Sequence, residues 1–303
     1  MSAAIYNTTF YESERKIYDT PKLLLWTVGI ADVAISAFAI LSNVTCMLIL
    51  ATSKLMKIPF VIYIFNILIT DSITVYTLGF YWAFYIMLQG NIGYCVFFNT
   101  TYHIAFSCSN LSLMAFAMER FLILLFPFKF KPFSRRTVII IMLICWLLSV
   151  ATQWPEYHKY EVTYNDDGSA KCGPKKSNDL IPIIEIVWQW AMPSITLIIL
   201  NFGIIFAIKR QKKTKKSKKI KDGGVVKALV ISCFMQVLCP TPRAFIYMLL
   251  HNDLIPITPI YYVTLTQTAN CLSHTFNAFL FMISWSKLKQ EYARRFCCKK
   301  LES

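Results

Sequence analysis

Seven stretches of about twenty or more apolar residues recur along this 303-residue chain, separated by short polar or basic segments. A helix needs about 20 such residues to cross a bilayer core, since each residue adds only about 1.5 Å. The chain is 56% hydrophobic and 16% charged, whereas ordinary soluble domains carry about 25% charged residues. The pattern therefore predicts an all-α membrane protein, a bundle of seven transmembrane helices.

The predicted spans fill nearly the whole chain. They cover residues 23–51, 59–88, 92–125, 137–154, 181–208, 225–250 and 257–285. Residues 1–22 form a short N-terminal arm without the pattern of a cleavable signal peptide, so we expect the first span to act as the targeting signal. Residues 286–303 complete the chain as an amphipathic eighth helix and a tail.

The distribution of charge predicts the orientation in the membrane. The formal net charge is +15, and most of the 31 Lys and Arg residues fall in alternate connecting segments and after the last span. By the positive-inside rule, this places the N-terminus outside the plasma membrane and the C-terminus in the cytoplasm. The most basic run, residues 209–227, is expected to contact anionic lipid headgroups or an acidic partner, and not nucleic acid.

Two acidic residues lie within apolar spans, where an ionisable group is costly unless it faces the bundle or water. For Asp32, two interpretations stay open: a hydrated position near the outer interface, or a role inside the bundle. Asp71 lies near the middle of its span and indicates a functional or cation-binding role.

Several motifs occur in a particular order and at matching membrane depth. They are Leu41-Ser42-Asn43 in the first span, Asn66 and Asp71 in the second, Cys95, Ser109 and Met118-Glu119-Arg120 in the third, Phe126-Pro127-Phe128-Lys129-Phe130 after it, Trp146 in the fourth and Pro193 in the fifth. Through this set the chain resembles the rhodopsin-like (class A) family of G-protein-coupled receptors. The resemblance implies a receptor, not an enzyme, that transduces binding of an extracellular peptide or small polar molecule into activation of a heterotrimeric G protein.

The resemblance also implies residues for coupling and switching. These are Glu119, Arg120, Asn201, Pro240, Asn277 and Phe281. A charged pair of Glu119 and Arg120 at an inner helix end would stabilise a closed cytoplasmic face, the alternative being a pair that merely anchors the helix.

Three spans depart from the family pattern. In the sixth span the kink proline is Pro240 or Pro242, and under either alignment the switch tryptophan is missing. In the seventh span, Asn277-Ala278-Phe279-Leu280-Phe281 stands where the family has Asn-Pro-x-x-Tyr, and Asn201 replaces a usual tyrosine. These departures concern activation and leave the expected fold unchanged.

Two groups of residues are expected to bind small partners. By the resemblance, Asp71, Ser109 and Asn277 converge around sodium or water, with no other metal or cofactor, and retinal is excluded because the seventh span has no lysine. The expected ligand site consists of Tyr102, His103, Phe106, Glu185, Trp188, Arg243 and Gln267. A pairing of Glu185 with Arg243 is the alternative to their contact with ligand.

The predicted topology also assigns covalent features. Cys95 and Cys172 are the two cysteines placed outside, in an oxidising compartment, and are expected to form a disulfide. Around Asp167-Gly168, alternating residues indicate a hairpin, with a flexible loop as the alternative. Asn7 begins a glycosylation sequon. Cys297 and Cys298 follow the amphipathic eighth helix and are palmitoylation candidates, or else a reduced pair.

Three other functional classes are compatible with seven spans. A non-signalling decoy or scavenger receptor would keep the fold and lose coupling. A transporter or channel is less favoured, because the sequence has no inverted repeat. A membrane-embedded enzyme would need a polar cluster such as paired histidines, and we expect His103, His158, His251 and His274 to lie apart from one another.

Overall fold

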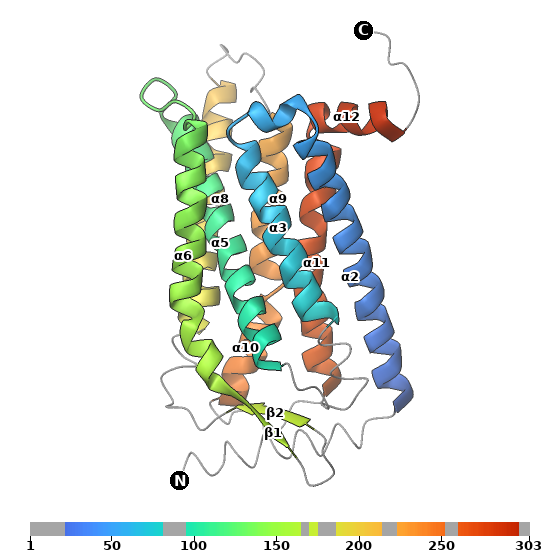
Figure 1. The fold of residues 1–303 in the computed structure, drawn as a ribbon. Coiled ribbons are helices and arrows are strands. Elements are labelled where there is room, and N and C mark those ends of the chain that lie inside the picture. The colour runs from blue at the N-terminus through green and yellow to red at the C-terminus, as the bar shows by residue number, and fades with distance from the viewer. Residues whose placement is uncertain are drawn as a thin grey trace.

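The computed structural model describes residues 22–80, 95–164, 170–174, 186–213, 223–251 and 260–296. Long helices run side by side in one bundle (Figure 1). They are α2 (Lys22–Ala51), α3 (Val61–Val75) with the π-helix η2 (Tyr76–Phe80), α5 (Cys95–Leu125), α6 (Arg135–Lys159), the π-helix η3 (Ile186–Ala191) with α8 (Met192–Lys213), α9 (Gly223–Leu238) with α10 (Thr241–His251), and α11 (Ile260–Ser284). In six of these segments the described residues are long and apolar enough to cross a membrane, and α11 completes the bundle. The predicted seven-helix membrane fold is confirmed.

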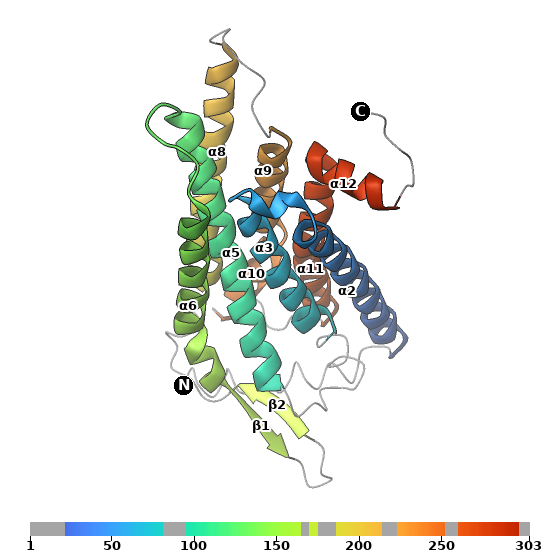
Figure 2. The ribbon, with the colours of Figure 1, turned by 45° about the horizontal axis from the view of Figure 1, so that its top comes forward.

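The two ends of the bundle carry different elements (Figures 1 and 2). At the end that we name the α12 end, the helix α12 (Ser286–Phe296) lies across the bundle, near the 3-10 turn η1 (Lys54–Lys57). At the opposite end, named the hairpin end, β1 (Tyr160–Tyr164) pairs antiparallel with β2 (Ala170–Pro174). This pairing is the one that the alternating sequence favoured over a flexible loop.

The hairpin lies beside the start of α5. Helix α5 begins at Cys95 and contacts β1, whose Val162 is the register partner of Cys172 in β2. The side chains of Cys95 and Cys172 lie outside the described residues, as do Asn7, Cys297 and Cys298. The predicted disulfide, glycosylation and palmitoylation therefore stay predictions. The described cysteines within the spans form no disulfide.

The sixth span breaks between α9 and α10. Pro240 is buried at this break, and α10 starts at Thr241. Proline lacks a backbone N–H and clashes with the preceding turn, which explains the interruption. Leu238, a candidate for the place of the missing tryptophan, is 63% exposed, and Gln236 is the last buried residue of α9. The last inward-pointing side chain of α9 is thus an amide, whereas Leu238 faces outward.

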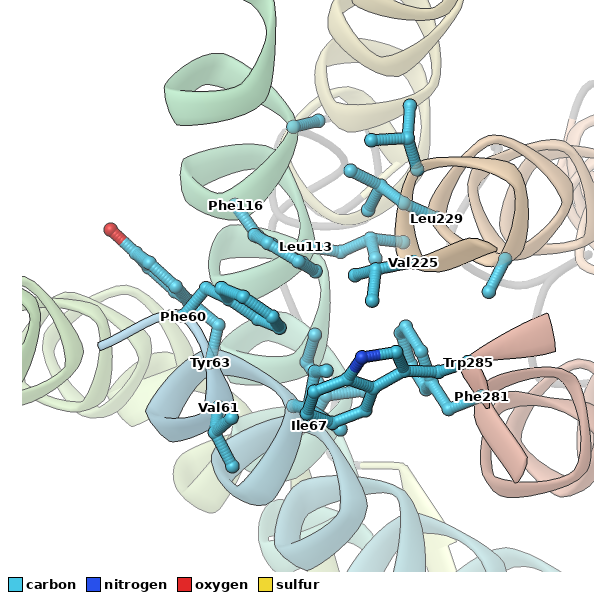
Figure 3. Packing of buried hydrophobic residues seen from close by; sticks show 14 of the residues in the cluster. Phe60, Val61, Tyr63, Ile67, Leu113, Phe116, Val225, Leu229, Phe281 and Trp285 are labelled. Carbon is cyan, nitrogen blue, oxygen red and sulfur yellow. The ribbon is translucent and has the colours of Figure 1, made fainter. Parts of the chain in front are cut away.

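An aromatic layer fills the bundle near the α12 end (Figure 3). Phe60 and Trp285 lie 5.3 Å apart between ring centroids, and Tyr63 stacks on Phe116, also at 5.3 Å. Phe281 is fully buried in the same cluster. This layer joins α3, α5 and α11 and fixes the junction from which α12 departs.

Helix α12 has the amphipathic character that its sequence predicts. Leu288 is fully buried against the bundle, whereas Tyr292 and Phe296 are partly exposed and lie 4.9 Å apart between ring centroids. Arg295 donates a hydrogen bond to Thr52 at the end of α2. The helix is therefore attached through Leu288 in its first turn and Arg295 in its last, and it presents an apolar side along which a membrane surface can lie.

Two leucine substitutions test which faces of the bundle are packed. Leu68 in α3 is fully buried, and Leu147 in α6 is 70% exposed. We expect Leu68→Ala to reduce the free energy of unfolding by about 2–5 kcal/mol, because it leaves a cavity among packed side chains. Leu147→Ala is the matched control and should leave thermal unfolding of the purified protein nearly unchanged. Equal losses of stability would contradict this assignment of core and lipid-facing sides.

Candidate functional site

A buried carboxylate joins three helices at the middle of the bundle. Asp71 in α3 is fully buried. Its Oδ1 accepts hydrogen bonds from Ser109 Oγ at 2.8 Å and from His274 Nδ1 at 2.7 Å, and its Oδ2 accepts one from Asn277 Nδ2 at 2.7 Å. The structure thus brings together the three residues expected to converge, Asp71, Ser109 and Asn277. It adds His274, which sequence reasoning missed.

The donor set at Asp71 does not fit the sodium ion that the resemblance implies. A hard cation prefers oxygen ligands, whereas His274 presents a ring nitrogen to the carboxylate. The His274 ring packs against Phe106, with the two ring centroids 5.6 Å apart and the planes at 70°. One signal for His274 was present in the sequence: it lies three residues before Asn277, nearly one helical turn, and so on a similar side of the seventh span.

The expected ligand residues gather on the hairpin side of this cluster. The Tyr102 hydroxyl accepts hydrogen bonds from Arg243 at 3.1 Å and from Asn270 at 3.0 Å. The Arg243 guanidinium also lies 5.3 Å from the Tyr102 ring centroid. Phe106 stacks on Tyr102 at 5.7 Å. A cation and an aromatic wall are thus held together by side chains from α5, α10 and α11.

The other expected ligand residues are placed as follows. His103 is buried and contacts Gln189 at 2.9 Å. Trp188 is half-buried in the π-helix η3. Glu185 and the side chain of Gln267 lie outside the described residues, so the alternative pairing of Glu185 with Arg243 stays open. Asp32 is not among the expected ligand residues, and the sequence leaves two positions open for it. It is buried and accepts a hydrogen bond from Thr268 in α11, which favours a position inside the bundle over a hydrated one at the outer interface.

A chain of amides, which sequence reasoning missed, connects this layer to the sixth span. Gln189 donates to Gln153 Oε1 at 2.5 Å, and the Gln189 backbone carbonyl accepts from Asn110 at 3.2 Å. Asn110 in turn accepts from Gln236 Nε2 at 2.8 Å. Gln189 lies in a π-helix, a turn that displaces backbone carbonyls from regular pairing and is frequent at functional sites. The available signal was the amides themselves, because unpaired amides are costly in an apolar interior.

The expected switch pair lies at the α12 end. Arg120 is 3.7 Å from Glu119 Oε2, and Glu119 Oε1 accepts the backbone N–H of Phe133 at 2.9 Å. The guanidinium lies over Phe60 at 4.6 Å and Phe116 at 5.3 Å from their ring centroids. Such cation–π contacts contribute about 0.5–2 kcal/mol each. Arg120 is therefore held by α3 and α5, while α9 contains no acidic residue that could bind it.

The remaining expected switch residues link the helices near this end. Asn201 in α8 donates to the Val230 carbonyl of α9 at 3.4 Å. Phe281 packs beside Trp285 (Figure 3). A Cβ atom on Gly224 would lie 1.8 Å from the Ser284 carbonyl oxygen. The α9 and α11 backbones therefore touch, and this close approach requires glycine.

Comparison with known proteins identifies the family. A model of the 7 transmembrane receptor (rhodopsin family) matches residues 42–288. The chain belongs to the rhodopsin family of seven-transmembrane receptors. This match agrees with the sequence resemblance, and it is a family of receptors and not of enzymes. The chain is thus a multi-pass membrane receptor protein.

Individual relatives are distant. The chain is 27% identical to human C-C chemokine receptor type 6 over 248 residues, which is 74% of this chain and 64% of the relative. It is 26% identical to the mouse receptor of the same name, over 67% of this chain and 58% of the relative. It is also 26% identical to the probable G-protein coupled receptor tkr-1 of Caenorhabditis elegans, over 56% of this chain and 44% of the relative. The matched part spans less than two thirds of the length of each of these relatives.

A double-mutant cycle tests the contact between Asn110 and Gln236. Replacing Gln236 alone by leucine leaves the buried Asn110 Oδ1 without its donor, so we expect a loss of stability of about 1–3 kcal/mol. Replacing both residues by leucine should cost less than the sum of the single changes, since neither side chain of this pair is left without the other. The lost bond from Asn110 to the Gln189 carbonyl affects the Asn110 single variant and the double variant alike. The measurement is thermal unfolding of the four purified proteins. Strict additivity would show that the two side chains do not interact.

Proposed function

We propose that this receptor transduces binding of an extracellular ligand at the hairpin end into activation of a heterotrimeric G protein at the α12 end, in the plasma membrane. The charge distribution supports this orientation. Basic residues of the connections and helix termini gather at the α12 end, namely Lys54, Lys57, Lys129, Lys131, Arg135, Arg136, Lys209, Arg210, Arg294 and Arg295. By the positive-inside rule this is the cytoplasmic end, with the N-terminus outside.

The close contact of α9 with α11 carries the proposal. Gly224 lies directly against the Ser284 carbonyl, next to Trp285 at the start of α12. The Arg120 guanidinium packs over the rings of Phe60 and Phe116. The described α12 end is thus closed, and an outward swing of α9 would separate these backbones and expose the Arg120 guanidinium to a partner. A ligand drives this change only if it binds the open state more tightly than the closed state.

The loop between α5 and α6 supports a partner surface at the same end. Phe128 is fully exposed there, beside the Phe126–Phe130 ring pair. The segment also carries Lys129 and Lys131. An exposed aromatic ring among basic residues suits a protein partner with an apolar pocket and an acidic rim. Anionic headgroups are the further partner that we propose for the basic segment 209–227.

The amide chain gives a route from ligand to α9. A ligand that moves His103 or Tyr102 disturbs Gln189, which contacts His103 and binds Asn110. Asn110 holds Gln236, one turn before the break at Pro240. The break is a hinge at which α9 can tilt while α10 stays with the ligand layer. In this receptor, hydrogen bonds would perform the coupling for which the family uses an aromatic switch.

We infer a peptide as the ligand class, with a small polar molecule as the alternative. The Arg243 guanidinium, held against Tyr102, can bind a carboxylate of such a ligand. Two relatives are named chemokine receptors, which also favours the peptide. Glu185, Trp188 and Gln267 remain proposed contacts of the same site.

A second candidate is a non-signalling decoy or scavenger receptor. Leu238 points away from the bundle, and Ala278 and Phe281 replace the proline and tyrosine of the family motif. These departures favour a receptor that binds ligand without releasing α9. A transporter or channel is the least favoured reading and would show solute flux without nucleotide exchange.

Guanine-nucleotide exchange on a panel of purified G proteins tests the proposed function. Membranes bearing the receptor, with and without a pool of peptides and small metabolites, should stimulate exchange on at least one G protein. Arg120→Ala should reduce it by about tenfold or more, the scale of a coupling worth 1–3 kcal/mol. Arg294→Ala is the control, since this arginine is exposed and pairs with Glu291 within α12. Ligand binding without exchange in any combination would favour the scavenger.

Two glycine substitutions test the closed contact. Gly224→Ala should raise exchange in the absence of ligand by about fivefold or more, because the added methyl group pushes α9 from α11. Gly79→Ala is the matched control. Gly79 lies in η2, away from α9, and its Cβ would lie 1.7 Å from Ser36 Oγ and 2.8 Å from Ser36 Cβ, so the added methyl group crowds a side chain of α2 and not the backbone of α11. We expect Gly79→Ala to lower thermal stability without raising exchange. A rise in both variants would indicate general loosening of the bundle instead.

A further inference from the structure

At Asp71, side chains of the protein donate hydrogen bonds to the carboxylate oxygen that a cation would otherwise contact. Ser109 and His274 both donate to Oδ1, at 2.8 and 2.7 Å. A carboxylate oxygen has two lone pairs, so this oxygen is saturated. Asn277 takes one lone pair of Oδ2. One lone pair of Oδ2 remains on this carboxylate. A hard cation such as Mg²⁺ or Ca²⁺ is coordinated by about six oxygen atoms, so this lone pair alone does not form a cation site.

The histidine cannot adapt to a cation as a hydroxyl can. An ionised carboxylate only accepts hydrogen bonds, so the Nδ1 atom that faces it at 2.7 Å carries a hydrogen. A serine hydroxyl can rotate and turn a lone pair toward a cation, but a ring N–H cannot. The imidazole is fully buried and packs at a steep angle against the ring of Phe106, which restricts its movement.

From these contacts we propose that His274 takes the place of sodium in this receptor. The imidazole N–H occupies the coordination position at Asp71 Oδ1, and the polar cluster of α3, α5 and α11 is held together without a metal ion. The stability of the receptor is then independent of sodium, unlike that of a site in which Asp71 and Ser109 share a cation. This inference does not depend on coupling to a G protein.

Thermal unfolding of the purified full-length receptor, without G protein, tests the proposal. Melting temperatures are compared in sodium chloride and in choline chloride at the same ionic strength. The wild-type protein should melt at the same temperature in both salts. His274→Ser removes the ring and supplies a hydroxyl oxygen, so it should gain a sodium-specific rise in melting temperature, as any ligand of the folded state produces. The double variant His274→Ser, Asp71→Asn should lose that rise.

His103→Ser is the matched control. His103 is also a buried histidine of the bundle, but its hydrogen bond goes to Gln189 and not to a carboxylate. This variant should show no sodium response. If His274→Ser fails to fold, His274→Asn supplies the oxygen in its place.

Two results would overturn the proposal. A sodium-specific rise in the wild-type protein that Asp71→Asn abolishes would show that the cation binds despite His274. No rise in either His274 variant, with both folded, would show that the imidazole is not what excludes sodium. Neither result bears on nucleotide exchange, so failure of this inference and failure of the proposed function are separately visible.

Discussion

The structure depends on one constraint: polar groups placed inside an apolar bundle must find their partners within it. An unpaired amide or carboxylate in such an environment costs several kcal/mol, so the buried polar side chains that pair across the bundle act as fixed connections between helices. Asp71 connects α3 with α5 and α11 through Ser109, His274 and Asn277. Nearer the α12 end, Asn66 joins Ser112 and Trp146, at 2.8 and 2.9 Å. Apolar packing fills the space between these connections, and the hydrogen bonds fix which helix faces which.

The same constraint distinguishes this receptor from the pattern that its family leads one to expect. In the sixth span, which lacks the switch tryptophan of the family, Gln236 reaches Asn110. Where a cation site is expected, His274 reaches Asp71. Both contacts are directional hydrogen bonds between buried side chains. Such bonds hold one arrangement strongly and fail abruptly when their geometry is lost, which suits a bundle that changes between two packed states.

Closure of the α12 end has a different physical basis. Arg120 lies on an aromatic surface formed by Phe60 and Phe116, and α9 approaches α11 through the backbone at Gly224. No ion pair between Arg120 and α9 is available, because α9 has no acidic residue. The approach of α9 to α11 depends on shape, and a displacement of α9 would remove it, whereas the contacts of Arg120 lie between α3 and α5. In the proposed function, the break between α9 and α10 at Pro240 is where such a displacement would begin.

The sequence by itself determined the fold class, the membrane orientation expected from charge, the family, and the positions of Asp71, Ser109, Asn277, Glu119 and Arg120 along their helices. It did so because the length of an apolar stretch and the spacing of its motifs are local properties. At about 1.5 Å per residue, they give the length of each helix and the depth of each motif along it. Only the tertiary structure decided which side chains meet. His274 lies over two hundred positions from Asp71, and Gln236 lies 126 positions from Asn110. Their contacts follow from how the helices are rotated and packed against one another, which no spacing within a single helix specifies.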